Sequence, residues 1–175
     1  MITKEFLNDG GTWEDYRLGT LFEIKGIKQA KSQNLIPKAT SSQNSVNYIV
    51  QSTQNNMFKM VANKSWLIEN NEPPVDGNAL VLGVTLPAVS YQPDEFGASQ
   101  VITARANFLD ENIGLFFVSI MQKQMAQFSY THKPGIEVYK NLNIPLPTKE
   151  GKIDFDFMRR YIATLKAERV ATLKA

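Results

Sequence analysis

The sequence predicts a mixed α/β (α+β) fold, with an irregular, largely antiparallel sheet around one buried helix and a C-terminal helix of the spacer type. Short segments with strand character, separated by Gly, Pro and Asn, fill the chain up to residue 106. A broad apolar helical pattern follows at residues 110–128, and a second one starts after Asp154 and still runs at Ala175. These features in 175 residues predict one domain with a sizeable core.

The strands are predicted from the alternation of apolar and polar residues and from apolar runs bounded by turn residues. A leading segment at residues 1–11 and a long polar loop at residues 29–45 precede most of them. The first two predicted strands form a hairpin with a polar tip at residues 51–56. Strands are expected at residues 46–50, 57–62, 79–84, 88–92 and 100–106 and, with bends, at residues 136–147.

Each predicted helix begins with an aspartate that can accept from the free N–H groups of the first turn, Asp110 or Asp154. The first helix has a broad apolar side and is expected at the centre of the core. The second carries a narrower stripe, interrupted by Arg169, and no Gly, Asn or Pro closes it. It is either a terminal core helix or, as the missing C-cap favours, one that continues and pairs with another helix. The stripe consists of Phe155, Met158, Ile162, Leu165 and Leu173.

The net charge is only +2, but the charges are unevenly distributed along the chain. Six lysines and no acidic residue lie between Ile24 and Ile68, whereas five acidic residues and no Lys or Arg lie between Glu69 and Glu95. The basic stretch is also rich in Asn and Gln. Lysines neutralise phosphates, and side-chain amides make bidentate contacts to base edges. This composition suits a nucleic-acid surface, and a solvated loop region has the same composition.

Residue patterns typical of enzymes are sparse. The chain has no cysteine, which excludes disulfides and thiolate chemistry, and His132 is its one histidine. No acid near His132 in the sequence could orient it as a general base, and no Gly-rich loop follows a strand to hold a nucleotide. We therefore expect a non-catalytic binding protein without a cofactor or a metal. With no leader sequence and no apolar run long enough to span a bilayer, we expect it in the cytoplasm and not at a membrane.

Two other classes of function remain open. Glu23 and Lys25 have the Glu-x-Lys spacing of some metal-dependent nucleases, for which Asp15 would be the metal-binding partner. Alternatively, the protein is an adaptor whose terminal helix forms a coiled coil, and its basic residues are incidental.

Several segments, in this order along the chain, resemble a target recognition domain from the DNA specificity (S) subunit of type I restriction-modification systems. They are residues 16–26, Gly83-Val84-Thr85, Tyr91-Gln92-Pro93, residues 128–133, and Ile144-Pro145-Leu146-Pro147 before an Asp-x-x-Phe-Met helix. The recognition domains of fused restriction-methylation enzymes are similar too.

The resemblance implies a module that reads one half of a split double-stranded DNA target and docks to methyltransferase and restriction subunits, which carry the catalysis. It also implies a recognition domain at residues 1–152 and the start of a spacer or dimerisation helix at residues 153–175. Full members of the family usually carry two such domains and two helices. Whether two copies associate through the terminal helix stays open.

Within this interpretation, three patches are candidates for DNA contacts. The first would follow the phosphate backbone, the second would place a hairpin tip at base edges, and the third would be a second reading loop. Each patch also has a structural alternative, as solvated strand ends, an ordinary turn and a packed loop. The candidates are Lys25, Lys28, Gln29 and Lys31; Gln51, Ser52, Thr53, Gln54, Asn55 and Asn56; and Tyr130, His132 and Lys133.

Overall fold

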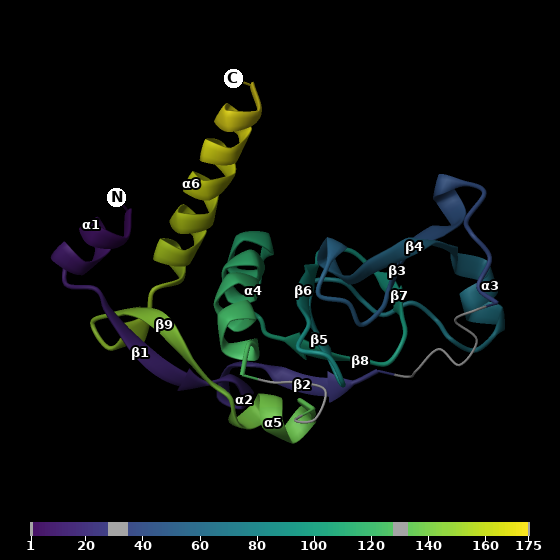
Figure 1. Ribbon diagram of the computed structural model, residues 1–175, viewed down its shortest axis with the longest axis horizontal. Coiled ribbons are helices and arrows are strands. Elements are labelled where there is room, and N and C mark those ends of the chain that lie inside the picture. The colour runs from purple at the N-terminus through teal and green to yellow at the C-terminus, as the bar shows by residue number, and fades with distance from the viewer. Residues whose placement is uncertain (1, 28–34, 128–132, 175) are drawn as a thin grey trace.

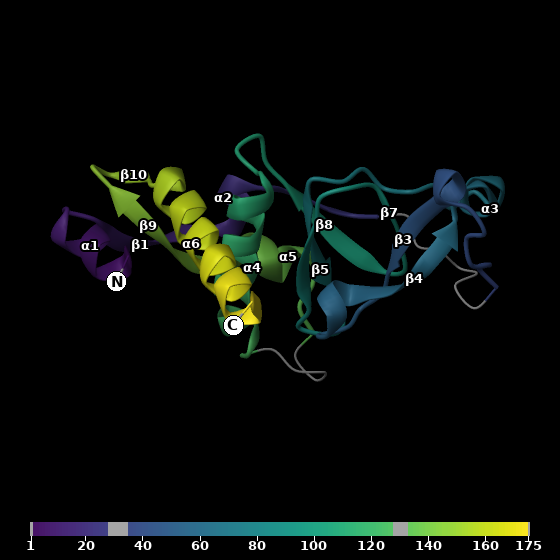
Figure 2. The same ribbon diagram turned by 90° about the horizontal axis from the view of Figure 1, so that it is seen from above.

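A computed structural model describes residues 2–27, 35–127 and 133–174 of the chain. The molecule is elongated, and three small sheets follow one another along its long axis (Figure 1). The first and last helices, α1 and α6, lie in one half of the molecule, and the predicted hairpin lies in the other (Figures 1 and 2). The mixed, largely antiparallel architecture confirms the predicted fold class.

The helices and strands are spread through the whole chain. The helices are α1 (Ile2–Asn8), α2 (Leu18–Leu21), α3 (Lys64–Glu69), α4 (Glu111–Met125), α5 (Ile136–Asn141) and α6 (Phe155–Lys174), with single 3-10 turns η1 (Ser42–Asn44) and η2 (Asn55–Met57). The strands are β1 (Thr12–Arg17), β2 (Glu23–Gly26), β3 (Ser45–Ile49), β4 (Phe58–Asn63), β5 (Ala79–Gly83), β6 (Val89–Gln92), β7 (Phe96–Ala98), β8 (Val101–Arg105), β9 (Asn143–Lys149) and β10 (Lys152–Ile153). None of these helices is both long and apolar enough to cross a membrane.

The sheets have the orders β1-β9-β10, β2-β8-β5-β6 and β4-β3-β7. All neighbouring strands are antiparallel except β3 and β7, which pair in parallel. The hairpin predicted from alternation is formed by β3 and β4, with the polar tip between them. The chain thus places this tip close to the middle sheet, because η2 contacts β6.

The strand β5 divides the core, because its side chains alternate between two apolar clusters. Leu80 and Leu82 belong to the large cluster that also contains the buried side of α4, whereas Ala79 and Val81 belong to a smaller cluster beneath the hairpin. All five residues of β5 are buried. Burial on both sides explains why β5 reads as a continuous apolar run in the sequence.

Both predicted aspartate caps are confirmed. The Asp110 carboxylate accepts from the Ile113 N–H at 3.0 Å, and that of Asp154 accepts from the Phe157 N–H at 2.8 Å. The helix α4 ends at Met125, before the predicted end at residue 128, and it packs against α6. As expected, α4 is the central core helix, with Ile113, Phe116, Phe117, Met121 and Met125 buried.

The strand β9 accommodates two prolines although it lies between β1 and β10. The Pro147 carbonyl accepts from the Asp154 N–H at 2.8 Å, so this residue directs its polar backbone atoms away from β1. Pro145 has the same orientation by alternation, and neither proline removes a bond from the β1 ladder. A tight turn follows, in which Glu150 and Gly151 both have positive φ, of 52° and 72°. Two such residues match the twist of a hairpin, here between β9 and β10.

One prediction of secondary structure was wrong. Residues 136–147, expected as a bent strand, form the helix α5 and then β9. The alternation of Ile136, Glu137, Val138 and Tyr139 suggested a strand, but the buried Tyr139 fixes a helical turn instead. Its hydroxyl donates to the Gly83 carbonyl at 2.6 Å, and burial raises its pKa far above the ordinary value.

Candidate nucleic-acid interface

The hairpin tip is held against the β5–β6 turn by Gln51. Its Oε1 accepts from the N–H groups of Val84 and Thr85, both at 2.7 Å, and from that of Leu86 at 3.3 Å. The turn is tight, since a Cβ at Gly83 would lie 2.2 Å from the Leu86 carbonyl oxygen. Gln51 therefore positions the tip, and its side-chain oxygen already accepts hydrogen bonds within the protein.

Other residues of the tip are also committed to the fold. The Ser52 hydroxyl accepts from the Gln54 N–H at 3.1 Å, and Asn56 donates to the Tyr91 carbonyl at 3.3 Å. Asn55 donates to the Phe58 carbonyl at 3.5 Å. Asn55, Asn56 and Met57 all have positive φ, which asparagine tolerates better than most residues. The asparagines thus build the turn, as the structural alternative anticipated.

The side chains of two residues of the tip remain available for contacts with a ligand. Thr53 and Gln54 are exposed, and their side chains make no hydrogen bond with any residue that the structure describes. The predicted reading patch at residues 51–56 is therefore divided into positioning residues and free residues.

One described residue of the third predicted patch, Lys133, lies beside the same turn, near the segment that follows Lys25. A hollow of about 590 Å³ is lined by Gly26 and Ile27 at the end of the first patch, by Val84 of the turn, and by Lys133 at the end of the third patch. Lys28, Gln29, Lys31, Tyr130 and His132 lie outside the described residues. The walls of the hollow are mostly apolar, with Val101, Ile102, Ile136 and Val138 among them. Segments far apart in the sequence are therefore brought together around the β5–β6 turn.

Lys25 is exposed on β2, where its ammonium group lies 2.5 Å from the Glu23 carboxylate. Both side chains are more than half exposed, so water screens this pair and little free energy is needed to separate it. Lys25 can therefore exchange Glu23 for a phosphate.

The rest of the basic stretch is distributed over several elements. Lys59 lies on β4, and Lys64, at the start of α3, is paired with Glu95. Arg105 lies at the end of β8. Its guanidinium donates to the carbonyls of Asp76 and Gly77. Lys64 and Arg105 are therefore structural, and the lysines of the basic stretch that the structure describes lie on several separate elements.

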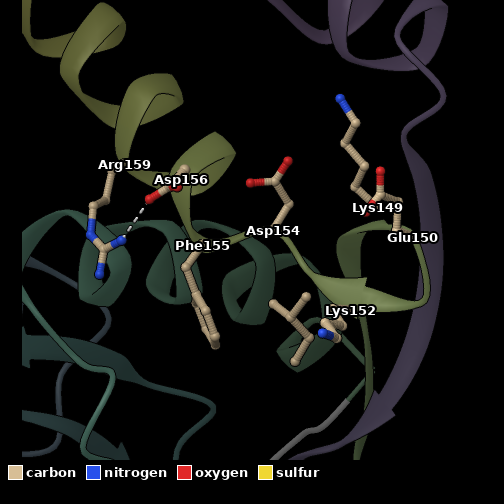
Figure 3. Close-up of a pocket in the computed structure, with 8 residues that line it drawn as sticks. Lys149, Glu150, Lys152, Asp154, Phe155, Asp156 and Arg159 are labelled. Atoms are coloured by element: carbon tan, nitrogen blue, oxygen red, sulfur yellow. Dashed lines mark hydrogen bonds and ion pairs between the residues drawn. The ribbon is translucent and has the colours of Figure 1, made fainter.

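A second hollow, of about 410 Å³, lies where the β9–β10 turn meets α6 (Figure 3). Its lining is strongly charged, but the charges serve the fold. Arg159 pairs with Asp110 at 2.7 Å and with Asp156 at 3.0 Å, and Asp154 caps α6. Lys149 pairs with Asp9 at 2.5 Å, and this hydrogen bond lowers the pKa of the Asp9 carboxyl. The charged contacts around this hollow join α6 to the rest of the domain.

No group of three or more His, Cys, Asp or Glu in residues 2–27, 35–127 and 133–174 could hold a metal ion. The structure brings the hairpin tip, with its exposed Thr53 and Gln54, to the β5–β6 turn, and Lys133 lines the hollow beside that turn. This arrangement is suited to contacts with an extended polyanion.

A family profile described as "Type I restriction modification DNA specificity domain" matches residues 10–175. The chain belongs to this family. The match confirms the resemblance drawn from the sequence and the expectation of a DNA-recognition module without its own catalysis, and it lends no support to the nuclease alternative. A search of curated proteins finds no match.

Solved structures support the fold. The HsdS subunit from Thermoanaerobacter tengcongensis has a TM-score of 0.58 at 14% identity, over 93% of this chain and 39% of the subunit. The type I restriction-modification S subunit from M. genitalium has a TM-score of 0.61 at 18% identity, over 96% of this chain and 42% of the subunit. A chain from a structural study of complex assembly and conformational transition of the type I R-M system has a TM-score of 0.53 at 12% identity. The match covers 93% of this chain and 40% of that one. The specificity domain thus spans about two fifths of each of these solved chains.

Proposed function

We propose that this specificity domain reads one half of a bipartite duplex DNA target within a type I restriction-modification assembly. The family match over residues 10–175 carries this proposal. The positions of Lys133 and the hairpin tip beside the β5–β6 turn support it, as does the exposed Lys25 on β2. The catalytic steps belong to methyltransferase and restriction subunits, and the assembly works where the DNA is, in the cytoplasm.

The proposed contacts fall into two kinds. Lys25 and Lys133 neutralise phosphates, as do Lys28 and Lys31 in the adjoining segment, and they set the register of the domain on the duplex. The hairpin tip supplies contacts to base edges, and Gln29, Tyr130 and His132 are further candidates for base contacts. Division of the chain at residue 152 into a recognition domain and a spacer helix remains part of this proposal.

The terminal helix supports a second part of the proposal, that α6 pairs with the equivalent helix of another specificity domain. Residues 163–174 are exposed throughout, and three large apolar residues are among them: Leu165, Val170 and Leu173, which are 44%, 49% and 70% exposed. In Figure 1 this half of α6 stands clear of the other elements. The second domain is either another copy of this chain or a further domain of a longer subunit.

Binding to duplex DNA tests the proposal. The full chain, assembled with its methyltransferase subunits, is used to select sequences from a pool of duplexes with randomised positions. We expect one half-site to be enriched, and binding to it to weaken as salt is raised, with a slope set by the number of phosphate contacts. Enrichment of no sequence over the random pool would contradict recognition by this domain.

Mutation of the phosphate contacts sharpens the test. Reversal of Lys25 to Glu should weaken binding to cognate and random duplexes alike and should reduce the salt slope. Lys59→Glu, on the exposed side of β4, is the matched control, because β4 lies outside the proposed contacts. Equal losses in the two variants would show that net charge alone governs binding.

A further inference from the structure

The exposed side of α4 meets the hairpin tip. Gln122, near the C-terminal end of α4, and Thr53 of the tip line the same small hollow, of about 190 Å³, with Pro87, Ala88 and Val89 of the β5–β6 hairpin. The two residues are 69 positions apart in the sequence, and the fold alone brings them together. Gln122 and the neighbouring Lys123 are both exposed.

The side chains at this hollow are free to bind a ligand. The side chains of Gln122, Thr53 and the adjacent Gln54 make no hydrogen bond with any residue that the structure describes. No carboxylate is among the described residues that line the hollow, so nothing there repels a phosphate backbone. By contrast, Gln51, Ser52 and Asn56 use their side chains to hold the tip in place.

The scaffold beneath these free groups is rigid. Gln51 fixes the tip to the β5–β6 turn, and Gln92 donates to the Asn56 carbonyl at 3.1 Å from the other side. Gln122 itself extends from a helix whose opposite side is buried in the core, next to Met121 and Met125. Groups that read base edges need this kind of support, because a loosely held side chain discriminates poorly between bases.

We propose that Thr53, Gln54 and Gln122 form a base-reading triplet, in which the two amides contact base edges in the major groove and Gln122 determines the base preferred at its position. The inference rests on the proposed DNA recognition and assigns it to particular side chains. A glutamine amide offers a donor and an acceptor side by side, which matches the edge of adenine, and a threonine methyl suits the methyl group of thymine. Gln51 and Asn56 support the triplet without contacting DNA.

The test compares variants on the half-site selected by the wild-type assembly and on duplexes that carry single base-pair changes in it. In Gln122→Ala we expect discrimination at one base position to fall by about tenfold or more. Discrimination at the other positions and the salt slope should be unchanged, because no phosphate contact is lost. Gln54→Ala and Thr53→Ala should each reduce discrimination at neighbouring base positions.

Gln43→Ala provides the matched control. Gln43 is an exposed glutamine in η1, which precedes β3 and so lies at the opposite end of the hairpin from the tip. Discrimination should be unchanged in this variant. Unchanged discrimination in all three triplet variants would overturn the inference, as would a uniform loss of affinity with a smaller salt slope, which indicates phosphate contacts. If the wild-type assembly itself selects no sequence, the proposed function fails first.

Discussion

The two halves of α6 have a similar apolar stripe but opposite surroundings. In the first half, Phe157, Met158 and Ile162 are buried, and Arg159 is paired with Asp110 at the start of α4. In the second half, every residue from 163 to 174 is exposed. One continuous helical pattern therefore contains a half that completes the core and a half that the domain leaves uncovered.

This difference shows that the two interpretations of the terminal helix drawn from the sequence apply to different parts of it. The apolar stripe in the sequence predicts which side of the helix is apolar. It does not predict how much of that side the rest of the domain covers. At Lys166 the last contact is polar, because its ammonium group lies 2.8 Å from both Glu111 and Asn112. Mutations in the two halves should thus affect different properties.

The largest expected effect on stability comes from a mutation in the first half of α6. Met158→Ala should lower the free energy of unfolding by about 2–5 kcal/mol, because it leaves a cavity between α6 and the core. Urea denaturation of the full chain measures this change. Leu165→Ala, the control in the exposed half, should change the free energy by less than about 0.5 kcal/mol. Similar losses in both variants would contradict the division of the helix.

Asp110→Ala should have the next largest effect. It removes the cap of α4 and the partner of Arg159 in one step, and a lost cap alone costs about 1 kcal/mol. Asp156→Ala is the control, since its carboxylate is 86% exposed and pairs with the same arginine. We expect that control to cost no more than a few tenths of a kcal/mol. Thermal unfolding should rank the two variants in this order.

Low pH should weaken the contact that Asp110 of α4 makes with Arg159 of α6. Burial alone would raise the pKa of the Asp110 carboxyl, but the hydrogen bonds from the Ile113 N–H and from Arg159 outweigh burial and hold it below the ordinary value. The contribution of Asp110 to stability is therefore fully present above about pH 4, the range of an unperturbed aspartate, and is lost as the pH falls through the lowered pKa. Unfolding of Asp110→Asn should depend less on pH in this range than unfolding of the wild type.

The smallest effect on folding should come from the exposed half. The double variant Leu165→Lys, Leu173→Lys should unfold like the wild type, within about 0.5 kcal/mol, but it should lose association through α6. Sedimentation at several protein concentrations measures that association. A wild-type chain that is monomeric at every concentration would exclude a pair made of two copies and leave pairing within a longer subunit.

The features that were predicted correctly depend on local sequence. Asp110 and Asp154 cap their helices through contacts three residues away, and the alternation in β3 and β4 reflects the two sides of a hairpin. α5 was missed because Ile136 and Val138 alternate with polar residues. The contact that selects the helix, from Tyr139 to Gly83, joins residues far apart in the sequence.

The roles of the candidate residues in the fold were predicted only in part, for the same reason. Gln51 and Asn56 have the composition of base-reading residues, and their roles in the fold depend on partners more than thirty residues away. Gln122 was overlooked because the helical pattern of α4 directs attention to its apolar side. An exposed amide on a core helix carries no signal in the sequence until the hairpin tip is placed beside it.

The partition of the core by β5 has a consequence for the evolution of this domain. Leu80 and Leu82 pack with the helices, whereas Ala79 and Val81 pack beneath the hairpin, so substitutions on one side need no compensation on the other. The side that packs beneath the hairpin can therefore diverge while the side that packs with the helices is unchanged. If the hairpin reads DNA as proposed, new specificities can arise without a change in the surface of the helices.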